Sequence, residues 1–287
     1  MKKPTIFSIM AMACLVACTS DNLEEPKPEE QVQTPRLLTV EVTENPLLDE
    51  NGGAKQAKTR ADEITTQTLK AFFMNYQANY YTFTKTGSTW STNSWPTDIA
   101  SSAKIDFYAY NGGTFNWNNG NPHLDFAVDK SSPASHQTDL LVAKNNVAFN
   151  DHSGKVPLTF DHACAAVEFY VCKTSGVADK QVVITSVTLS GVKDQGSYDY
   201  SSGWTLGEST ASYLLTTGSI TLTTEKQRLP CGYLFLIPQT KTGLTLNVNY
   251  TVNTGEEQSH DFNLSGIWNA GYEYTVNINM GTSIITE

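Results

Sequence analysis

Apolar and polar residues alternate along much of this chain, and a period of two predicts β-strands. The alternation is clearest at 244–252 and 272–280. Shorter alternating, aromatic-rich or β-branched runs predict further strands at 38–42, 68–76, 80–83, 104–110, 124–128, 140–143, 156–160, 167–171 and 182–189. Residues 198–204 predict a hairpin that turns at 201–203, and the continuous apolar run 231–237 predicts a central strand. Many short strands separated by turn signals, with no ordinary helix after the N-terminus, predict an all-β fold of β-sandwiches.

The phase of the alternation changes between two neighbouring runs. Val156, Leu158 and Phe160 alternate in one phase, whereas the run that begins at Val167 has the opposite parity. A change of parity requires a bulge, a bend or a passage from one sheet to another near His162. We therefore predict two tandem β-sandwich domains, one at 61–155 and one at 156–287.

The first 17 residues have the pattern of an export signal. Lys2 and Lys3 precede an apolar run over 6–16 that is too short to span a bilayer, which predicts a signal peptide. The tetrapeptide ending at Cys18 resembles the bacterial lipobox, which implies that Cys18 becomes the first mature residue and carries fatty-acyl chains such as palmitate. Several chains would anchor the protein stably in the outer membrane. The alternative is an ordinary secretory signal in which Cys18 has no role.

Residues 18–36 are rich in proline and acidic residues and contain little that is apolar, which predicts a disordered tether. The acids soon after Cys18, namely Asp21, Glu24 and Glu25, resemble the surface-export signal of Bacteroidetes lipoproteins. Such a signal implies exposure on the outer face of the outer membrane.

Residues 37–60 combine an isolated strand with a basic loop. Leu38, Val40 and Val42 alternate with polar residues, which predicts a half-buried strand. The small, polar and basic residues that follow predict an exposed loop, and Arg60-Ala61 within it is a good protease substrate.

The charge of the chain argues against some classes of binding partner. Its formal charge is -10, and cleavage of a signal peptide that contains Lys2 and Lys3 would make it more acidic. An acidic surface argues against nucleic acid and against anionic lipid headgroups as partners. No second apolar run is long enough for a transmembrane helix.

Three cysteines remain beyond Cys18, and an odd number excludes a closed disulfide framework. Cys164 and Cys172 share one extended run, where they would lie about 26 Å apart and could not bond to each other. The cysteines are therefore either buried free thiols, or one of these two pairs with Cys231.

No residue pattern indicates a cofactor, and none indicates a metal site. The histidines at 123, 136, 152, 162 and 260 lack metal-ligand spacing, and phosphate loops and nucleophile elbows are absent. His162 and Cys164 share one strand face, which favours a structural role for both. The acidic turns 49–52 and 194–196 are solvated turns or, alternatively, calcium sites. No convergent pair of carboxylates indicates a glycosidase. We predict that the protein is not an enzyme.

Aromatic residues suggest a second class of function. Trp90, Trp95, Trp117, Tyr80 and Tyr81 cluster in the first predicted domain, several of them in loops. Exposed aromatic rings on β-sandwiches stack on sugars, so a surface carbohydrate-binding lipoprotein that does not polymerise is the alternative function. Otherwise these rings pack the core or its rim.

Several motifs occur in an order that resembles the fimbrillin family (Mfa-like or FimA-like) of Bacteroidetes surface lipoproteins. They follow the lipobox in the sequence and lie at Ile105–Tyr110, Asp139–Ala143, Val156–Ala163, Ala166–Phe169, Leu236–Gln239 and Trp268–Tyr274. The resemblance spans roughly residues 37–280 and implies two tandem transthyretin-like (Greek-key) β-sandwiches. It also implies a structural or adhesive subunit of a cell-surface fimbria (type V pilus).

The resemblance further implies a mode of assembly. An Arg-directed protease would cut at Arg60-Ala61, and the strand that contains Leu38, Val40 and Val42 would then leave its groove. A C-terminal segment of a neighbouring subunit, here around 275–287, would replace it by β-strand addition. The implied partners are other fimbrial subunits and the outer membrane, and candidate adhesion ligands are glycans or proteins on host or bacterial surfaces.

Overall fold

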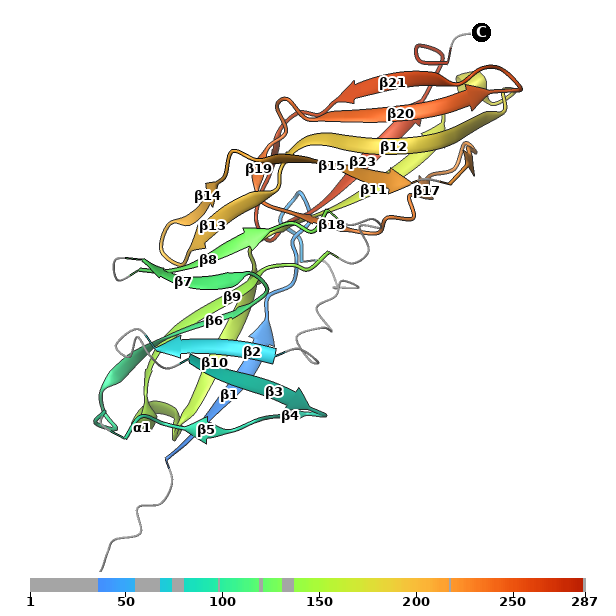
Figure 1. The fold of residues 1–287 in the computed structure, drawn as a ribbon. Coiled ribbons are helices and arrows are strands. Elements are labelled where there is room, and N and C mark those ends of the chain that lie inside the picture. Colours follow the sequence, from blue (N-terminus) through green and yellow to red (C-terminus); the bar gives the residue numbers. More distant parts are fainter. Residues whose placement is uncertain are drawn as a thin grey trace, which may run out of the picture. The chain divides into compact units, whose positions relative to one another are not determined.

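The structure is a computed structural model that describes residues 36–54, 68–73, 80–97, 99–118, 121–130, 137–216 and 218–285. These residues are almost entirely β-strands and turns, which confirms the predicted all-β class (Figure 1). The described helices are a single turn, α1 (Phe149–His152), and a 3-10 turn at Ser175–Val177. Within the described ranges, no helix is long and apolar enough to cross a membrane.

The largest sheet has eight strands in the order β4-β3-β2-β6-β9-β10-β1-β5. Their bounds are β1 Leu37–Glu44, β2 Thr68–Phe73, β3 Tyr80–Thr86, β4 Thr89–Trp90, β5 Asn93–Ser94, β6 Lys104–Asn111, β9 Leu141–Ala148 and β10 Lys155–His162. Most neighbours are antiparallel, but β1 runs parallel to β10. The first described strand of the chain therefore pairs with β10, which is the last strand of this sheet in the sequence.

One face of this sheet carries a cluster of buried apolar residues, which we name the first core. On β6 it contains Ile105, Phe107 and Ala109, whose inward orientation the alternation predicts. Its other buried members are Leu38, Val40, Phe83, Trp95, Leu141, Ala143, Val147, Val156, Leu158 and Phe160. The first core thus depends on residues from β1 as well as from the central strands.

The C-terminal half contains two further sheets and a short strand pair. In one sheet β11 (Ala165–Lys173) lies between β23 (Glu273–Met280), which is parallel to it, and the short strands β17 (Gln227–Arg228) and β18 (Leu234–Leu236). The other sheet has the order β15-β12-β20-β21, with β16 also on β12. Its strands are β12 Val182–Lys193, β15 Thr210–Thr216, β16 Ile220–Thr221, β20 Thr245–Val252 and β21 Gln258–Asn263; the pair is β19 Gln239–Thr240 with β22 Ile267–Trp268.

The prediction of a central strand at 231–237 is wrong. The run forms only the three-residue β18, and β11 is the central strand of that sheet. All three residues of β18 are nevertheless buried. A continuous apolar run indicates that both faces of a strand are buried. A strand with few hydrogen-bonded neighbours can also be buried, through packing against other elements.

A second cluster, the second core, joins the two C-terminal sheets. It includes Val167, Phe169 and Val171 of β11, together with inward residues of β12 and β20. The remaining cysteines are free thiols, of which Cys164 and Cys231 are buried and Cys172 is half-buried. The structure therefore agrees with the first of the two alternatives for the cysteines.

A fourth sheet combines strands from both halves of the chain in the order β14-β13-β8-β7. It contains β7 (Thr114–Asn118), β8 (Asn121–Ala127) and the predicted hairpin, β13 (Gln195–Asp199) and β14 (Gly203–Leu206). The pairing of β13 with β8 crosses the boundary predicted between residues 155 and 156. The division into tandem domains remains a prediction.

The change of parity near His162 corresponds to a passage between sheets. β10 ends at His162 in the eight-stranded sheet, and β11 begins at Ala165 in the sheet that contains β23. The inward side chains of β10 before His162 face the first core, and the inward side chains of β11 face the second core.

Candidate functional site

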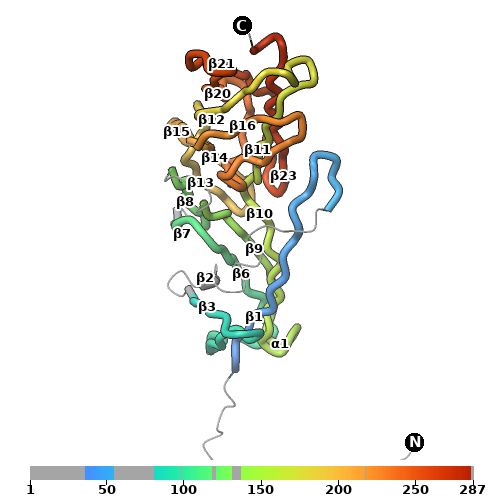
Figure 2. Tube along the Cα trace, turned by 90° about the vertical axis from the view of Figure 1, so that its right-hand side faces the viewer, coloured from blue at the N-terminus to red at the C-terminus, as the bar shows by residue number. Residues whose placement is uncertain are grey.

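Strand β1 occupies a slot between two strands of the first sheet. It pairs with β10 in parallel register, with Val40 opposite Val156 and Glu44 opposite Phe160. On its other edge β5 pairs only with Leu37 and the next residue. Figure 2 shows β1 in blue, running beside β10 toward the C-terminal sheets. We name this position, bounded by β10 and β5, the β1 slot.

The side chains of β1 alternate between the first core and solvent. Leu38 is fully buried and Val40 is 6% exposed, whereas the neighbouring Leu37 is 52% exposed. Val42 is half-buried and packs against the first core. The predicted half-buried strand is confirmed, and its inward side chains are those expected to be displaced.

Contacts of Arg36 hold the beginning of β1. Its guanidinium donates to the carbonyl oxygen of Ile99 at 3.0 Å and lies 5.0 Å from the ring centre of Phe149. Its own carbonyl oxygen accepts a hydrogen bond from the Trp95 amide at 2.7 Å. The strand is therefore fixed in register at its N-terminal end.

A buried ionic group holds the other end of β1. The imidazole of His162 lies between two carboxylates, with Nδ1 2.5 Å from Asp139 Oδ2 and Nε2 3.1 Å from Glu44 Oε1. The His162 side chain is only 3% exposed. Burial opposes its protonation, but the two carboxylates more than offset this and raise the pKa of His162 to about 9. At neutral pH the last residue of β1 therefore pairs with a buried cation.

Beyond Glu44 the chain continues into the second core. Asn45 donates to the Asp161 carboxylate at 2.6 Å, and Leu47 is fully buried in the second core. The Leu48 amide donates to Gly271 O at 2.9 Å, and the Glu273 amide donates to Leu48 O at 2.7 Å. We name residues 37–48 the β1 segment, because they form one continuous stretch that contacts both cores.

A hollow of about 450 Å³ lies beside this crossing. Its walls include Asn45 and Pro46 of the β1 segment, His162 of β10 and Tyr198 of β13. The buried ionic group is thus close to a space that solvent or another chain can enter.

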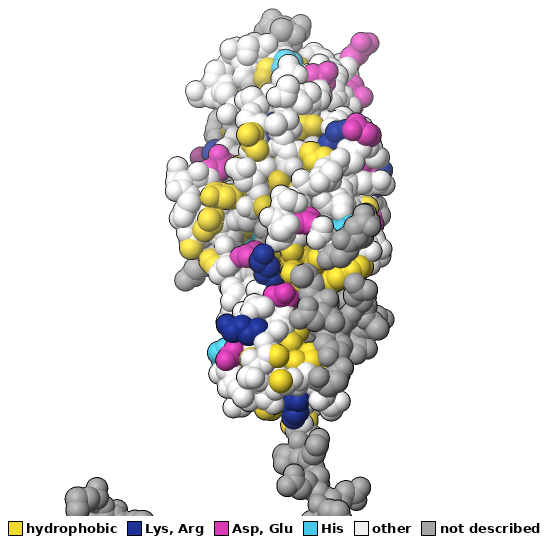
Figure 3. Space-filling view, turned by 90° about the vertical axis from the view of Figure 1, so that its left-hand side faces the viewer, with side chains coloured by type: hydrophobic (Ala, Val, Ile, Leu, Met, Phe, Trp, Pro, Cys, Tyr) yellow, Lys and Arg dark blue, Asp and Glu magenta, His cyan; other side chains and the backbone are white. Residues whose placement is uncertain are grey.

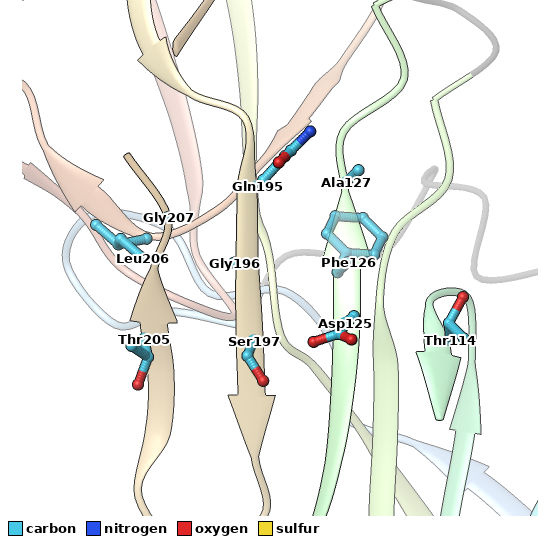
Figure 4. Close-up of a pocket in the computed structure, with 10 residues that line it drawn as sticks. All are labelled: Thr114, Asp125, Phe126, Ala127, Gln195, Gly196, Ser197, Thr205, Leu206 and Gly207. Atoms are coloured by element: carbon cyan, nitrogen blue, oxygen red, sulfur yellow. The ribbon is translucent and has the colours of Figure 1, made fainter. Parts of the chain in front are cut away.

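A second hollow, of about 520 Å³, lies over the sheet that contains β8 and β13 (Figure 4). Asp125 and Ser197 face each other on these neighbouring strands. Asp125 is the one acidic residue among the described residues that line the hollow, and it accepts a hydrogen bond from Asn116. Glycoside hydrolysis needs a pair of carboxylates, which the lining residues do not supply.

The surroundings of His162 and Cys164 indicate a structural role for both side chains. His162 engages Asp139 and Glu44, and burial raises the pKa of the Cys164 thiol well above its usual value. A thiol of this kind is a poor nucleophile at neutral pH. Among the described residues, no group of three or more His, Cys, Asp or Glu side chains is placed to hold a metal ion.

The aspartate of each acidic turn has partners within the protein. Asp49 accepts hydrogen bonds from the amides of Asn51 and Gly53 at 2.9 and 2.8 Å. Asp194 pairs with Lys130. Figure 3 shows one face of the molecule, on which acidic and basic side chains are interspersed. The described residues on that face form no large basic patch of the kind that nucleic acid requires.

The aromatic residues considered for sugar binding have different environments. Trp95 is 1% exposed, with ring centres 5.5 Å from Phe107 and from Phe149. Trp90 and Trp117 are half-buried. Trp95 therefore packs the first core and cannot stack on a ligand.

The remaining predicted site residues, Cys18, Arg60 and Ala61, lie outside the described residues. The expected donor segment, 275–287, is described up to residue 285 and begins within β23, paired with β11. Sequence reasoning missed the roles of Glu44, Asp139 and Leu47. A signal for Glu44 was present, because Leu38, Val40, Val42 and Glu44 have the same parity and the inward face of β1 thus ends in an acid.

The sequence model of a family described as fimbrillin-like matches residues 54–287, which is most of the chain. The chain belongs to the fimbrillin-like family. The match begins after the β1 segment, which lies outside the matched region. No curated protein matches the sequence.

Solved structures show that this fimbrillin-like protein shares its fold with several Bacteroides proteins. A fimbrial protein from Bacteroides vulgatus is 14% identical, with a TM-score of 0.58 over 86% of this chain and 96% of that one. A candidate cell adhesion protein from Bacteroides ovatus is 12% identical, with a TM-score of 0.56 over 88% and 95%. Another from Bacteroides uniformis is 20% identical, with a TM-score of 0.51 over 76% and 88%.

Replacing Gly154 with alanine should weaken the docking of β1 in this fimbrillin-like protein. Gly154 has φ +82°, and an added Cβ would lie 2.2 Å from the carbonyl oxygen of Leu37. Gly203, at φ +80° with open space around it, is the matched control for the backbone strain alone. We expect Gly154→Ala to lower the free energy of unfolding by about 1 to 3 kcal/mol more than Gly203→Ala. Urea denaturation checks this, and equal losses would contradict the close approach of β1.

The stability of this fimbrillin-like protein should fall as the pH rises above neutrality. His162 has a pKa of about 9 in the folded state against 6.5 in the unfolded chain, so its contribution is complete below pH 6.5 and is lost as the pH passes 9. The full contribution is on the order of 3 kcal/mol. Between pH 6.5 and 8, below the usual pKa of thiols, we expect the free energy of unfolding to drop by about 1 to 2 kcal/mol. Urea denaturation of the protein and of His162→Gln over this range measures it, and an unchanged slope in the variant would refute it.

Proposed function

We propose that this protein is a structural or adhesive subunit of a cell-surface fimbria and that it has no catalytic role. In this proposal it is exported as a lipoprotein on Cys18, resides in the outer membrane facing outward, and assembles by donor-strand exchange after cleavage at Arg60-Ala61. Membership of the fimbrillin-like family and the fold shared with a fimbrial protein from Bacteroides vulgatus support the proposal.

The observation that carries the proposal is the position of β1. This strand is inserted in parallel beside β10, and it supplies Leu38 and Val40 to a core built otherwise from later strands. Its removal would expose the edge of β10, with unpaired amides and carbonyls, and an apolar groove beside it. An added strand from another subunit would satisfy both the hydrogen bonds and the groove.

The position of the proposed cut, between β1 and the next strand, supports cleavage there. The proposed cut at Arg60-Ala61 lies between β1, which ends at Glu44, and β2, which begins at Thr68. A cut at this place would leave both strands intact and would make β1 a separate chain. Non-covalent contacts alone would then hold β1 in its slot, which is the condition for exchange.

Treatment with an Arg-specific protease tests the proposal. We expect a new N-terminus at Ala61, loss of the segment that contains β1, and complexes between subunits that resist denaturant. Arg60→Gln is the control and should give none of these. N-terminal sequencing, mass spectrometry and gel electrophoresis measure the outcomes. A cleaved protein that keeps β1 and stays monomeric, even when other fimbrial subunits are added, would contradict donor-strand exchange.

A further inference from the structure

Four side chains of the β1 segment, at fixed spacing, have buried partners. Leu38 and Val40 enter the first core, Glu44 meets His162, and Leu47 enters the second core. The exchange step of the proposed function concerns a slot in the first sheet, but the contacts of this segment continue past that sheet to the beginning of β23. Departure of the segment would therefore open a surface longer than the slot in the first sheet. A strand that replaces the segment would have to match this surface at several separate positions.

We propose that this surface selects its incoming strand by chemistry. The strand carries apolar residues at the places of Leu38 and Val40, a carboxylate at the place of Glu44, and an apolar residue at the place of Leu47. It is a segment of a different subunit and not of a second copy of this chain. This inference rests on the proposed function, because it requires the β1 segment to leave.

The requirement for a carboxylate comes from the charges around His162. Asp139 approaches the Nδ1 side, Glu44 approaches Nε2, and Asp161, next to His162 in β10, bonds to Asn45. On β13, Tyr198 lines the same hollow. Loss of Glu44 removes the carboxylate that lies 3.1 Å from Nε2 and leaves that side of the buried imidazolium without a counter-ion, which is unfavourable. An incoming carboxylate restores the pair, and an incoming lysine would place like charges together.

The requirement for a second apolar anchor comes from Leu47. This residue is fully buried in the second core, and the backbone of Leu48 bonds on both sides to residues at the start of β23. A strand that filled only the first core would leave this position open. The parallel register with β10 places Val40 and Glu44, and the backbone bonds of Leu48 place Leu47.

The sequence of this chain indicates that the incoming strand belongs to another protein. Within its 287 residues, the combination of apolar residues at i and i+2, an acid at i+6 and an apolar residue at i+9 occurs once, at Leu38–Leu47. The C-terminal segment has no acid between Glu273 and Glu287. Its strand β23 pairs with β11 along its whole length, and Ile285 is buried in the second core.

Peptide exchange on the full chain cut by an Arg-specific protease tests the inference. The reference peptide carries residues 37–48, and variants carry Glu44→Lys or, as a matched control at an exposed position, Glu41→Lys. Glu41 pairs with Lys155 at 3.1 Å, and both side chains are about half exposed. A fourth peptide carries residues 274–285. Native mass spectrometry measures how well each peptide replaces the bound segment, and the same protein is used with these four peptides.

We expect Glu44→Lys to weaken replacement by about tenfold or more, since it breaks a buried charge pair. Glu41→Lys should weaken it by less than about threefold. The 274–285 peptide should compete about tenfold less well than the reference or worse. In His162→Gln, the difference between the reference and the Glu44→Lys peptide should shrink.

Equal competition by the reference and Glu44→Lys peptides would overturn the requirement for a carboxylate. Equal competition by the 274–285 peptide would overturn the assignment to a different subunit. Retention of the cut segment against every peptide would contradict the proposed function itself, and this inference with it. Replacement without discrimination contradicts the inference alone, so the two failures are distinguishable.

Discussion

Leu38→Asp is expected to release strand β1 from the first sheet. The Leu38 side chain is fully buried, so the substitution removes apolar contacts and places a carboxylate in the first core. Truncation of a buried leucine alone costs about 2 to 5 kcal/mol, and a buried charge adds to this. We expect the free energy of unfolding to fall by at least about 3 kcal/mol. The loss is limited by the free energy needed to release β1 from the sheet, because the rest of the fold can remain intact after β1 has left. Urea denaturation measures the loss, and hydrogen exchange of the amides of Val156, Leu158, Thr159 and Phe160 reports whether the edge of β10 is open.

The neighbouring residue provides the control. Leu37 is 52% exposed, and Leu37→Asp introduces the same charge on the opposite face of the same strand. We expect it to change the free energy of unfolding by less than about 0.5 kcal/mol. Similar losses for the two variants would mean that β1 does not lie in the sheet with this register, and the proposed strand exchange would lose its main support.

Trp95→Ala is the second substitution with a large expected effect. The Trp95 ring is 1% exposed and contacts Phe107 and Phe149, and its backbone amide bonds to Arg36 at the start of β1. Truncation of a buried tryptophan costs about 3 to 5 kcal/mol. We expect a loss of that size in urea denaturation, together with faster removal of β1 after cleavage.

The same substitution separates core packing from sugar binding. Trp117 is half-buried, with its ring centre 6.2 Å from that of Phe115, and Trp117→Ala should cost about 1 kcal/mol or less. If Trp95→Ala left stability unchanged and abolished binding on a glycan array, the alternative of a carbohydrate-binding protein would replace the fimbrial one. Loss of stability without a change in the array supports the core role.

The β1 segment links the two cores in this fold. Contacts of Leu38 and Val40 stabilise the first core, and Leu47 is buried in the second. Exchange of this segment would therefore alter packing in both halves of the chain. A donor that replaced only the strand would restore the first core and leave the second incomplete.

Most strands could be predicted from the sequence because alternation is a local pattern. The run at 104–110 forms β6 with the predicted residues inside, and the run at 272–280 forms β23. The turn at 201–203 joins β13 and β14 as expected. The continuous run 231–237 misled the prediction, because apolar composition reports burial but does not identify the hydrogen-bonded neighbours of a strand.

The buried ionic group could be predicted only in part. Glu44 and His162 each stand at the end of an inward-facing series of apolar residues, in β1 and in β10. That parity indicates two titratable side chains that point inward. It does not indicate that they meet, because the meeting depends on β1 lying parallel to β10 in one register. The third member, Asp139, precedes β9 and carries no pattern of its own.

By itself the sequence determined the all-β class, the inward faces of most strands and the resemblance to fimbrillins, since each depends on residues close together in the chain or on motifs in a fixed order. Only the tertiary structure decided which strands are neighbours, that β13 pairs with β8 across the two halves, and that His162 joins Asp139 to Glu44. The physical reason is that side-chain alternation fixes which face of a strand is buried, whereas pairing is chosen by the packing of all strands together.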